Sequence, residues 1–247
     1  MIATGTTATA RGIMARREVV VTDVSVAGTQ EPFVRGMGLR APGGELTVVG
    51  CDPGVPQVAL ALALGGRVDL LTGSVTVGGD GRRAHLQQIT RLVDVPDVTA
   101  PEEALRVAAV VAEELALAER PSGRRDVAAL LAAHDLSDRA RDRWDSVPAA
   151  TRTALLLELG ARHPHVRVIV LCGPDRHGGD ANGWLRSARS LSESGLTVIV
   201  LCSPATAATL AGTAPGTAPG TAPGTAPDTA PATVSPSTAH PLPGATP

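Results

Sequence analysis

The sequence belongs to a chain of moderate length that is rich in small apolar residues and poor in aromatic ones. It has 247 residues, of which 43% are hydrophobic, with one Phe, two Trp, no Tyr and a formal net charge of −2. This length predicts one domain, or one domain with an appendage, and a core built from Ala, Val and Leu. The lack of aromatic stacking groups and of a basic tail argues against a nucleic-acid partner.

The basic residues are all of one kind. The chain contains 22 Lys and Arg residues together, and every one of them is Arg. Chemistry that depends on a lysine, such as Schiff-base formation or the gripping of a phosphate by a P-loop lysine, is therefore excluded for these 247 residues acting alone.

Cysteine usage and hydropathy indicate the compartment. Cys51, Cys172 and Cys202 are far apart in sequence, odd in number and without metal-ligand spacing, which predicts free thiols in a reducing environment. The N-terminus lacks the apolar core of a secretory signal. The longest apolar runs, such as Val58–Leu64 and Val166–Cys172, are too short to cross a bilayer. We expect a cytoplasmic protein without direct membrane insertion, which reaches the membrane only through a partner.

The two ends of the chain differ in composition from its middle. Residues 1–16 are rich in Thr, Ala and Gly and are expected to be flexible. Residues 205–247 carry TAPG repeats, in which a Pro at every fourth position blocks both helix and central strand. We interpret this segment as a disordered tail that acts as a linker or spacer. Residues 17–204 are then the ordered domain.

The first half of that domain predicts short strands and one helix. Glu18–Val24 has strand-like alternation, and Glu45–Val49 reads as a short buried strand that runs into a loop rich in Gly and Pro. Gln57–Leu64 is rich in Ala and Leu and predicts a helix. Ser74–Val77 predicts another short strand, which ends at two glycines.

The second half alternates between helices and buried strands. Pro101–Arg120 predicts a long helix, because a Pro and two Glu residues open it and its apolar residues follow helical spacing. Shorter helices are predicted over Asp126–His134, Ala149–Arg162 and Gly183–Ser194. Val166–Leu171 and Leu196–Leu201 are continuous apolar runs, which are typical of strands buried on both faces.

This order of elements predicts an α/β fold with a parallel sheet covered by helices. Ligands of such sheets bind at the carboxyl ends of the strands. Here those ends are Gly50–Gln57, Cys172–Asp175 and Cys202–Pro204. We therefore look for function in these three segments.

Five segments together resemble the nucleotide-binding subunit of ABC transporters in their order and spacing. They are GLRAPGGELTVVGCDPG (38–54), SVTVGGD (74–80), VTAPEEALRVAAVVAEEL (98–115), WDSVPAATRTALLLELGARHPHVRVIVLCGPD (144–175) and SESGLTVIVLCS (192–203). The resemblance covers residues 17–204. It implies a P-loop NTPase-like three-layer sandwich with a mostly parallel sheet, a small N-terminal β-subdomain and a helical subdomain. It also implies ATP as cofactor, and a membrane permease or a homologous ATPase subunit as partner.

The phosphate-binding loop of this family has the form GxxxxGK[ST], in which backbone N–H groups and the Lys hold phosphate and the hydroxyl holds Mg²⁺. The matching positions are Gly50, Cys51, Asp52, Pro53, Gly54, Val55, Pro56 and Gln57. Val55, Pro56 and Gln57 replace the second Gly, the Lys and the Ser/Thr. Pro56 offers neither an N–H group nor a charge, and Asp52 adds a negative charge. The resemblance thus implies a degenerate loop, with weak or absent binding of ATP.

The other motifs of the family are also altered. Cys172 and Gly173 stand where the metal-supporting Asp and the following Glu are expected, and Ser203 stands at the switch-histidine position. Asp175 is a displaced carboxylate, which we interpret as a loop or capping residue, with a role in the site as the alternative. Asp180, in a GGD sequence, resembles the D-loop that contacts the opposite subunit. Ser146 is the one match to the signature motif, and its structural alternative is an N-cap.

The combined losses predict a pseudo-ATPase subunit with negligible hydrolysis, for which we assign no catalytic residue and no metal ligand. Two other hypotheses stay open. One is a sensor that binds a nucleotide or anion through Gly50–Gln57 and Arg176–Asp180 without hydrolysing it. The other is an unrelated α/β enzyme that uses cysteine or histidine at the sheet edge. For His163 and His165 we expect a turn between helix and strand rather than a metal site.

Overall fold

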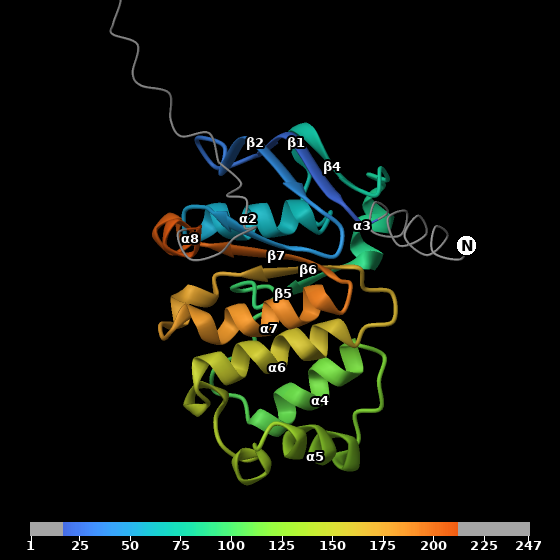
Figure 1. The fold of residues 1–247 in the computed structure, drawn as a ribbon, viewed down its shortest axis with the longest axis vertical. Helices are drawn as coiled ribbons and strands as arrows, with labels where there is room; N and C mark the ends of the chain where they lie inside the picture. Colours follow the sequence, from blue (N-terminus) through green and yellow to red (C-terminus); the bar gives the residue numbers. More distant parts are fainter. Residues whose placement is uncertain (1–16, 212–247) are drawn as a thin grey trace, which may run out of the picture.

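The computed structural model describes residues 17–211 (Figure 1). These residues form seven strands in two sheets, with helices between and below the sheets. The flexible segment predicted for residues 1–16, and residues 212–247 of the predicted tail, lie outside this range. The chain continues past residue 204 as α8 (Pro204–Ala211), so the tail prediction was wrong for residues 205–211. A Pro is tolerated in the first turn of a helix, the residues that follow are mostly Ala and Thr, and Leu210 is buried.

The N-terminal subdomain is an antiparallel sheet with the order β2-β1-β4. Its strands are β1 (Val19–Val26), β2 (Val34–Ala41) and β4 (Leu70–Val77). β2 was not predicted, because its sequence VRGMGLRA contains two glycines and weak strand formers. Pairing with β1 stabilises this strand, although its residues have a low strand propensity of their own.

The central sheet is parallel and has the order β3-β7-β6-β5. Its strands are β3 (Leu46–Gly50), β5 (Thr90–Val93), β6 (Val168–Cys172) and β7 (Thr197–Cys202). Every residue of β6 and β7 is buried, as their continuous apolar runs predicted. β3 and β7 are neighbours although most of the chain separates them, and all four strands end at the carboxyl edge, where ligands of such sheets bind.

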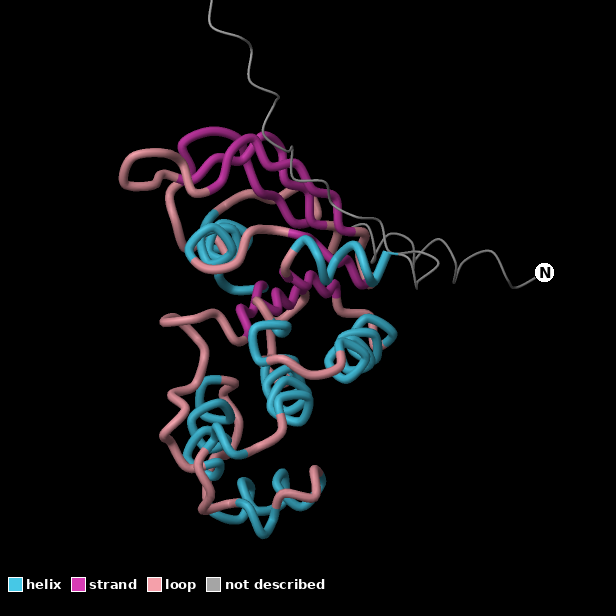
Figure 2. Tube along the Cα trace, turned by 90° about the vertical axis from the view of Figure 1, so that its left-hand side faces the viewer, coloured by secondary structure: helices cyan, strands magenta, loops and turns pink. Residues whose placement is uncertain are grey.

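Helices cover both faces of the parallel sheet. α2 (Val55–Leu64) lies between the two sheets, while α6 (Ala149–Ala161) and α7 (Ala181–Glu193) lie on the opposite face (Figures 1 and 2). Each face has its own apolar cluster. One includes Leu60 and Leu64 of α2, and the other is centred on the buried leucines of α6. The resulting layers hold the carboxyl edge of the sheet in place.

The helical subdomain lies below α6 and contains α4 (Val107–Leu117) and α5 (Arg124–Ala133) (Figure 1). The helix predicted over Pro101–Arg120 was too long at both ends. Arg106 is extended and forms an isolated bridge with Arg143, and the Trp144 N–H donates to the Leu105 carbonyl at 2.8 Å. This pairing with a distant segment competes with helix formation before Val107.

The remaining elements are short. α3 (Arg83–Ile89) and β5 follow each other directly in a polar sequence and were not predicted. Three 3₁₀ turns, η1 (Ser137–Arg139), η2 (Trp144–Ser146) and η3 (Pro174–His177), complete the described chain. The predicted α/β class, with a parallel sheet, an N-terminal β-subdomain and a helical subdomain, is confirmed.

Among the described helices, none combines the length and the apolar character that crossing a bilayer requires.

A partly buried ion pair joins the central sheet to the helical subdomain, and it leads to a prediction on pH dependence. Arg91 of β5 donates to Glu114 of α4 at 2.9 Å, and burial raises the pKa of Glu114 above its usual 4.5 although Arg91 opposes the rise. The folded protein therefore binds this proton more tightly than the unfolded chain. The contribution of Glu114 to the free energy of unfolding must fall as pH rises above 4.5 through the raised pKa.

We predict that Glu114→Gln flattens the pH profile of the unfolding free energy in that window, because the variant has no proton to lose there. Urea unfolding between about pH 4 and about pH 8 measures the effect. Glu193→Gln, at an exposed position of α7, is the matched control and should keep the slope of the parent. A Glu114→Gln profile as steep as that of the parent would contradict the assignment.

Candidate functional site

The loop that follows β3 lies at the carboxyl edge of the sheet, beside the end of β7. The Cys51 N–H donates to the Cys202 carbonyl at 2.9 Å, which ties the loop to the end of β7. Gly54 then serves as the N-cap of α2 with φ +86°, a conformation that favours glycine. The predicted phosphate-loop residues Gly50–Gln57 are thus placed at the edge where the sequence analysis expected them.

The start of α2 lacks one of the donors that would bind an anion. Val55 and Pro56 are the first two helical residues, and no side chain caps the helix. Pro56 has no N–H group, and the Val55 side chain is 55% exposed. Free N–H groups in the first turn are what make a helix N-terminus attract anions. Here one of these donors is missing.

Gln57 points inward at the end of the parallel sheet. The residue is only 4% exposed, and a Cβ placed on Gly173 would lie 2.7 Å from its Oε1 atom. The carboxamide therefore lies against the backbone that follows β6. Its Nε2 atom is buried without a hydrogen-bond partner. The side chain closes the space between the end of the β3 loop and the end of β6.

A second polar group at this edge is a three-residue cluster. Asp94 directly follows β5, and its side chain is 5% exposed. Its Oδ1 accepts from Arg176 Nη2 at 2.7 Å, and its Oδ2 lies 2.9 Å from His177 Nε2. Arg176 Nη1 also donates to the carbonyls of Asp94 and Cys172. The guanidinium thus joins the carboxyl ends of β5 and β6 and neutralises the buried carboxylate.

The backbone is shaped to form this cluster. η3, which carries Arg176 and His177, is flanked by Gly173 at φ +58° and Gly178 at φ +69°. Asp94 itself has φ +59°, which is unfavourable for a residue with a side chain. The sequence analysis singled out Arg176–Asp180 but missed Asp94. The available signal was an acidic residue placed immediately after a strand.

Asp175 has a structural role at this edge. Its Oδ2 accepts from the Ser203 N–H and the Thr206 hydroxyl, both at 2.9 Å, and so ties η3 to the start of α8. Burial acts to raise the pKa of Asp175, but the hydrogen bonds from Ser203 and Thr206 outweigh it and lower the pKa below its usual value. These contacts support the capping interpretation made from the sequence.

Two further predicted residues have local partners. Asp180 is the N-cap of α7 and accepts from the Asn182 N–H at 3.0 Å. Ser146 lies in η2, where its hydroxyl donates to the Arg143 carbonyl. The N-cap of α6 is Pro148, so the N-cap interpretation of Ser146 was wrong. A proline with extended φ and ψ starts the helix without any side-chain cap.

The cysteines and histidines do not form a reactive group. The three thiols are free, and burial raises the pKa of Cys51 to about 11 and those of Cys172 and Cys202 to about 12. Thiols that stay protonated are poor nucleophiles and poor metal ligands. His163 and His165 lie in the turn between α6 and β6, as expected. Residues 17–211 contain no group of three metal-ligating side chains.

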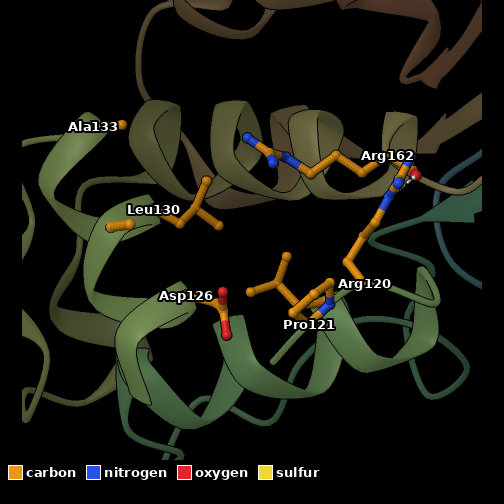
Figure 3. Close-up of a pocket in the computed structure, with 8 residues that line it drawn as sticks. Arg120, Pro121, Asp126, Leu130, Ala133 and Arg162 are labelled. Carbon is orange, nitrogen blue, oxygen red and sulfur yellow. Dashed lines mark hydrogen bonds between the residues drawn. The ribbon is translucent and has the colours of Figure 1, made fainter. Parts of the chain in front are cut away.

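A separate pocket lies within the helical subdomain, between the ends of α4, α5 and α6 (Figure 3). Its volume is 410 Å³, and apolar side chains such as Leu115 and Leu130 line much of it. The Arg120 Nε donates to the Arg162 carbonyl at 3.0 Å, and Arg162 pairs with Glu158. Asp126 accepts from the Gly123 N–H. The charged groups that line the pocket therefore already have partners within the protein. The pocket has no part in the sheet-edge site.

Comparison with family models and with curated proteins gives no match. Comparison with solved structures finds a similar fold in a protein described as an ABC transporter ATP-binding protein from Pyrococcus furiosus. The TM-score is 0.57 at 13% identity, over 75% of this chain and 91% of that one. A nucleotide-free ATP-binding cassette from an ABC transporter gives 0.55 at 13% identity, over 76% and 82%. Residues 17–211 therefore have the P-loop NTPase-like fold of an ABC ATP-binding cassette.

The orphaned amide of Gln57 leads to a stability prediction. Gln57→Leu replaces a buried group that lacks a partner by an apolar one of similar size, so the unfolding free energy should rise by about 1 kcal/mol. Gln57→Ala leaves a cavity instead and should lower it by about 2 kcal/mol. Urea unfolding of both variants checks the pair. A loss of stability in Gln57→Leu as large as in Gln57→Ala would show that the amide is hydrogen-bonded.

The Asp94 cluster leads to a second prediction. Asp94→Asn keeps the shape of the side chain but removes the charge that Arg176 and His177 share. The guanidinium is then left at the strand ends without its counter-ion, and we expect a loss of about 2 kcal/mol in unfolding free energy. Asp97→Asn, at an exposed neighbouring position, should cost less than about 0.5 kcal/mol. Equal effects in thermal or urea unfolding would contradict the cluster.

Proposed function

We propose that this chain is a pseudo-ATPase subunit, an ABC cassette that works in the cytoplasm with a membrane permease or with an active ATPase partner. One observation carries the proposal: the cassette fold is combined with a phosphate-loop position that reads GCDPGVPQ. The fold supplies the shape of an ATP-binding subunit, while this loop lacks the groups that hold ATP.

The residues at the end of β3 do not fit a magnesium–nucleotide. A phosphate chain needs N–H donors, a cation and a hydroxyl for the metal. Pro56 provides neither a donor nor a charge, and Asp52 repels phosphate. Gln57 stands at the hydroxyl position, and its carboxamide is turned inward against Gly173. The 247 residues contain no Lys that could move in from elsewhere.

The carboxylates near the end of β6 are also engaged. Asp175 accepts from Ser203 and Thr206, and Asp94 is held by Arg176 and His177. Both carboxylates are thus committed to contacts within the protein. Since each such group contributes orders of magnitude to a rate, hydrolysis of ATP should be negligible.

A subunit of this kind acts through its shape. We infer that it holds the cytoplasmic face of a permease or completes a pair with a competent ATPase. The exposed Asp180 at the start of α7, in the sequence that resembles a D-loop, is the residue we expect nearest to such an ATPase partner. The chain would then be peripheral at the membrane.

We predict that calorimetric titration of the full chain with ATP or ADP, with and without Mg²⁺, gives no heat at about 1 mM nucleotide, and that nucleotide does not raise the melting temperature. The reason is the missing donor and the missing cation at Pro56. Binding in the micromolar range would overturn the proposal.

A pair of variants assigns the cause of the loss. Val55→Gly/Pro56→Lys/Gln57→Ser restores the family pattern, and Val55→Gly/Pro56→Ala/Gln57→Ser makes the same backbone and cavity changes without the charge. We expect ATP–Mg²⁺ to bind more tightly to the lysine variant than to its alanine control, by at least about tenfold. Equal behaviour would mean that the lysine is not what the loop lacks.

A further inference from the structure

A recess opens beside the Asp94 cluster and is not used by the proposed function. It lies between the segment that follows β5, η2, the first turns of α6, and η3. Its volume is 490 Å³, within the range of small-molecule sites. It is located on the carboxyl side of β5 and β6, where α/β sheets bind ligands.

One side of the recess is acidic. Asp97, Glu102 and Glu103 line it, and all three are exposed residues of the single segment between β5 and α4. Within residues 17–211, none of these carboxylates has an ion-pair partner. An ammonium group arriving here would meet three acceptors that the protein has not used.

The opposite wall carries Arg152, from the first turns of α6. Its Nε atom is buried and has no hydrogen-bond partner, which is costly for a guanidinium. The other cation in the lining, Arg176, already pairs with Asp94. Arg152 lines the recess and forms no ion pair within residues 17–211, so a ligand carboxylate would pair with its guanidinium, and an Arg–carboxylate pair is among the stronger polar interactions.

Apart from the Asp94 cluster, the remaining lining is apolar. Val98 lines the recess and is one of the large apolar residues of the described chain that stay exposed, at 47%. Trp144, Pro96 and Pro101 lie around the same space. A ligand with an aliphatic group would cover Val98 and remove apolar surface from water.

We propose that this recess binds a small α-amino acid with an aliphatic side chain. The ammonium group faces Glu102 and Glu103, the carboxylate pairs with Arg152, and the side chain packs over Val98. A metal ion is not the cation expected here, because the described residues hold no group of three suitable ligands. The recess is separate from the end of β3, so this proposal does not depend on whether the loop after β3 binds a nucleotide.

The test uses the full chain and probes that differ only in their charged ends. L-leucine is compared with 3-methylbutylamine, which lacks its carboxylate, and with 4-methylpentanoate, which lacks its ammonium group. L-valine, L-isoleucine and L-methionine extend the series. Calorimetry should show binding of at least one of the four amino acids, with both leucine analogues at least about tenfold weaker than leucine.

Two variants locate the binding. Arg152→Gln should weaken amino-acid binding by at least about tenfold and leave the weak amine response unchanged. Arg189→Gln, an exposed arginine of α7, is the matched control and should change neither. Circular dichroism confirms that both variants are folded.

Three results would overturn the proposal. They are no response to any of the four amino acids, an equal response to leucine and its two single-ended analogues, and full binding in Arg152→Gln. Seating of a partner polypeptide in the recess without any effect of free amino acids would assign this surface to protein contact instead.

Discussion

The burial of both faces of the parallel sheet is the constraint on which the rest of the structure depends. β6 and β7 are buried at every residue, so no polar side chain that needs water can stand within them. Polar chemistry is displaced to the points where the strands end. This is why Gln57, Asp94 and Asp175 all gather at the carboxyl edge, although they come from distant parts of the chain.

Two of the carboxylates at that edge are bound by other groups of the protein. Asp175 is bound by Ser203 and Thr206, and Asp94 by Arg176 and His177. A buried carboxylate must be paired, and an internal partner meets that need as well as a ligand would. Gln57 is the exception, because its buried Nε2 has no partner. The Gln57 amide is thus a polar group at this edge for which residues 17–211 supply no internal partner.

The sequence predicted the parts of the fold that depend on local pattern. The strands β6 and β7 and the Ala- and Leu-rich α2 were found because burial on all sides leaves a continuous apolar run in the sequence. β2, α3, β5 and α8 were missed, because their short or polar sequences are held by pairing and packing with distant segments. The same limit applied to the site. Arg176 and His177 were visible as a polar, glycine-flanked group, but only the fold brings Asp94 to them.

The Asp94 cluster links the ends of β5 and β6 to the recess in which we propose a binding site. By fixing η3 against the end of β5, the Asp94–Arg176 pair closes the centre of the edge and at the same time builds one wall of the neighbouring recess. The unfavourable backbone conformation of Asp94, with φ +59°, therefore serves to position Arg176 and His177 rather than to hold a metal. What remains unsatisfied lies to the side, at Arg152 and the three rim carboxylates. Unmet polar groups are where a ligand gains most, which is why we place the proposed amino-acid site in the recess rather than at the phosphate loop.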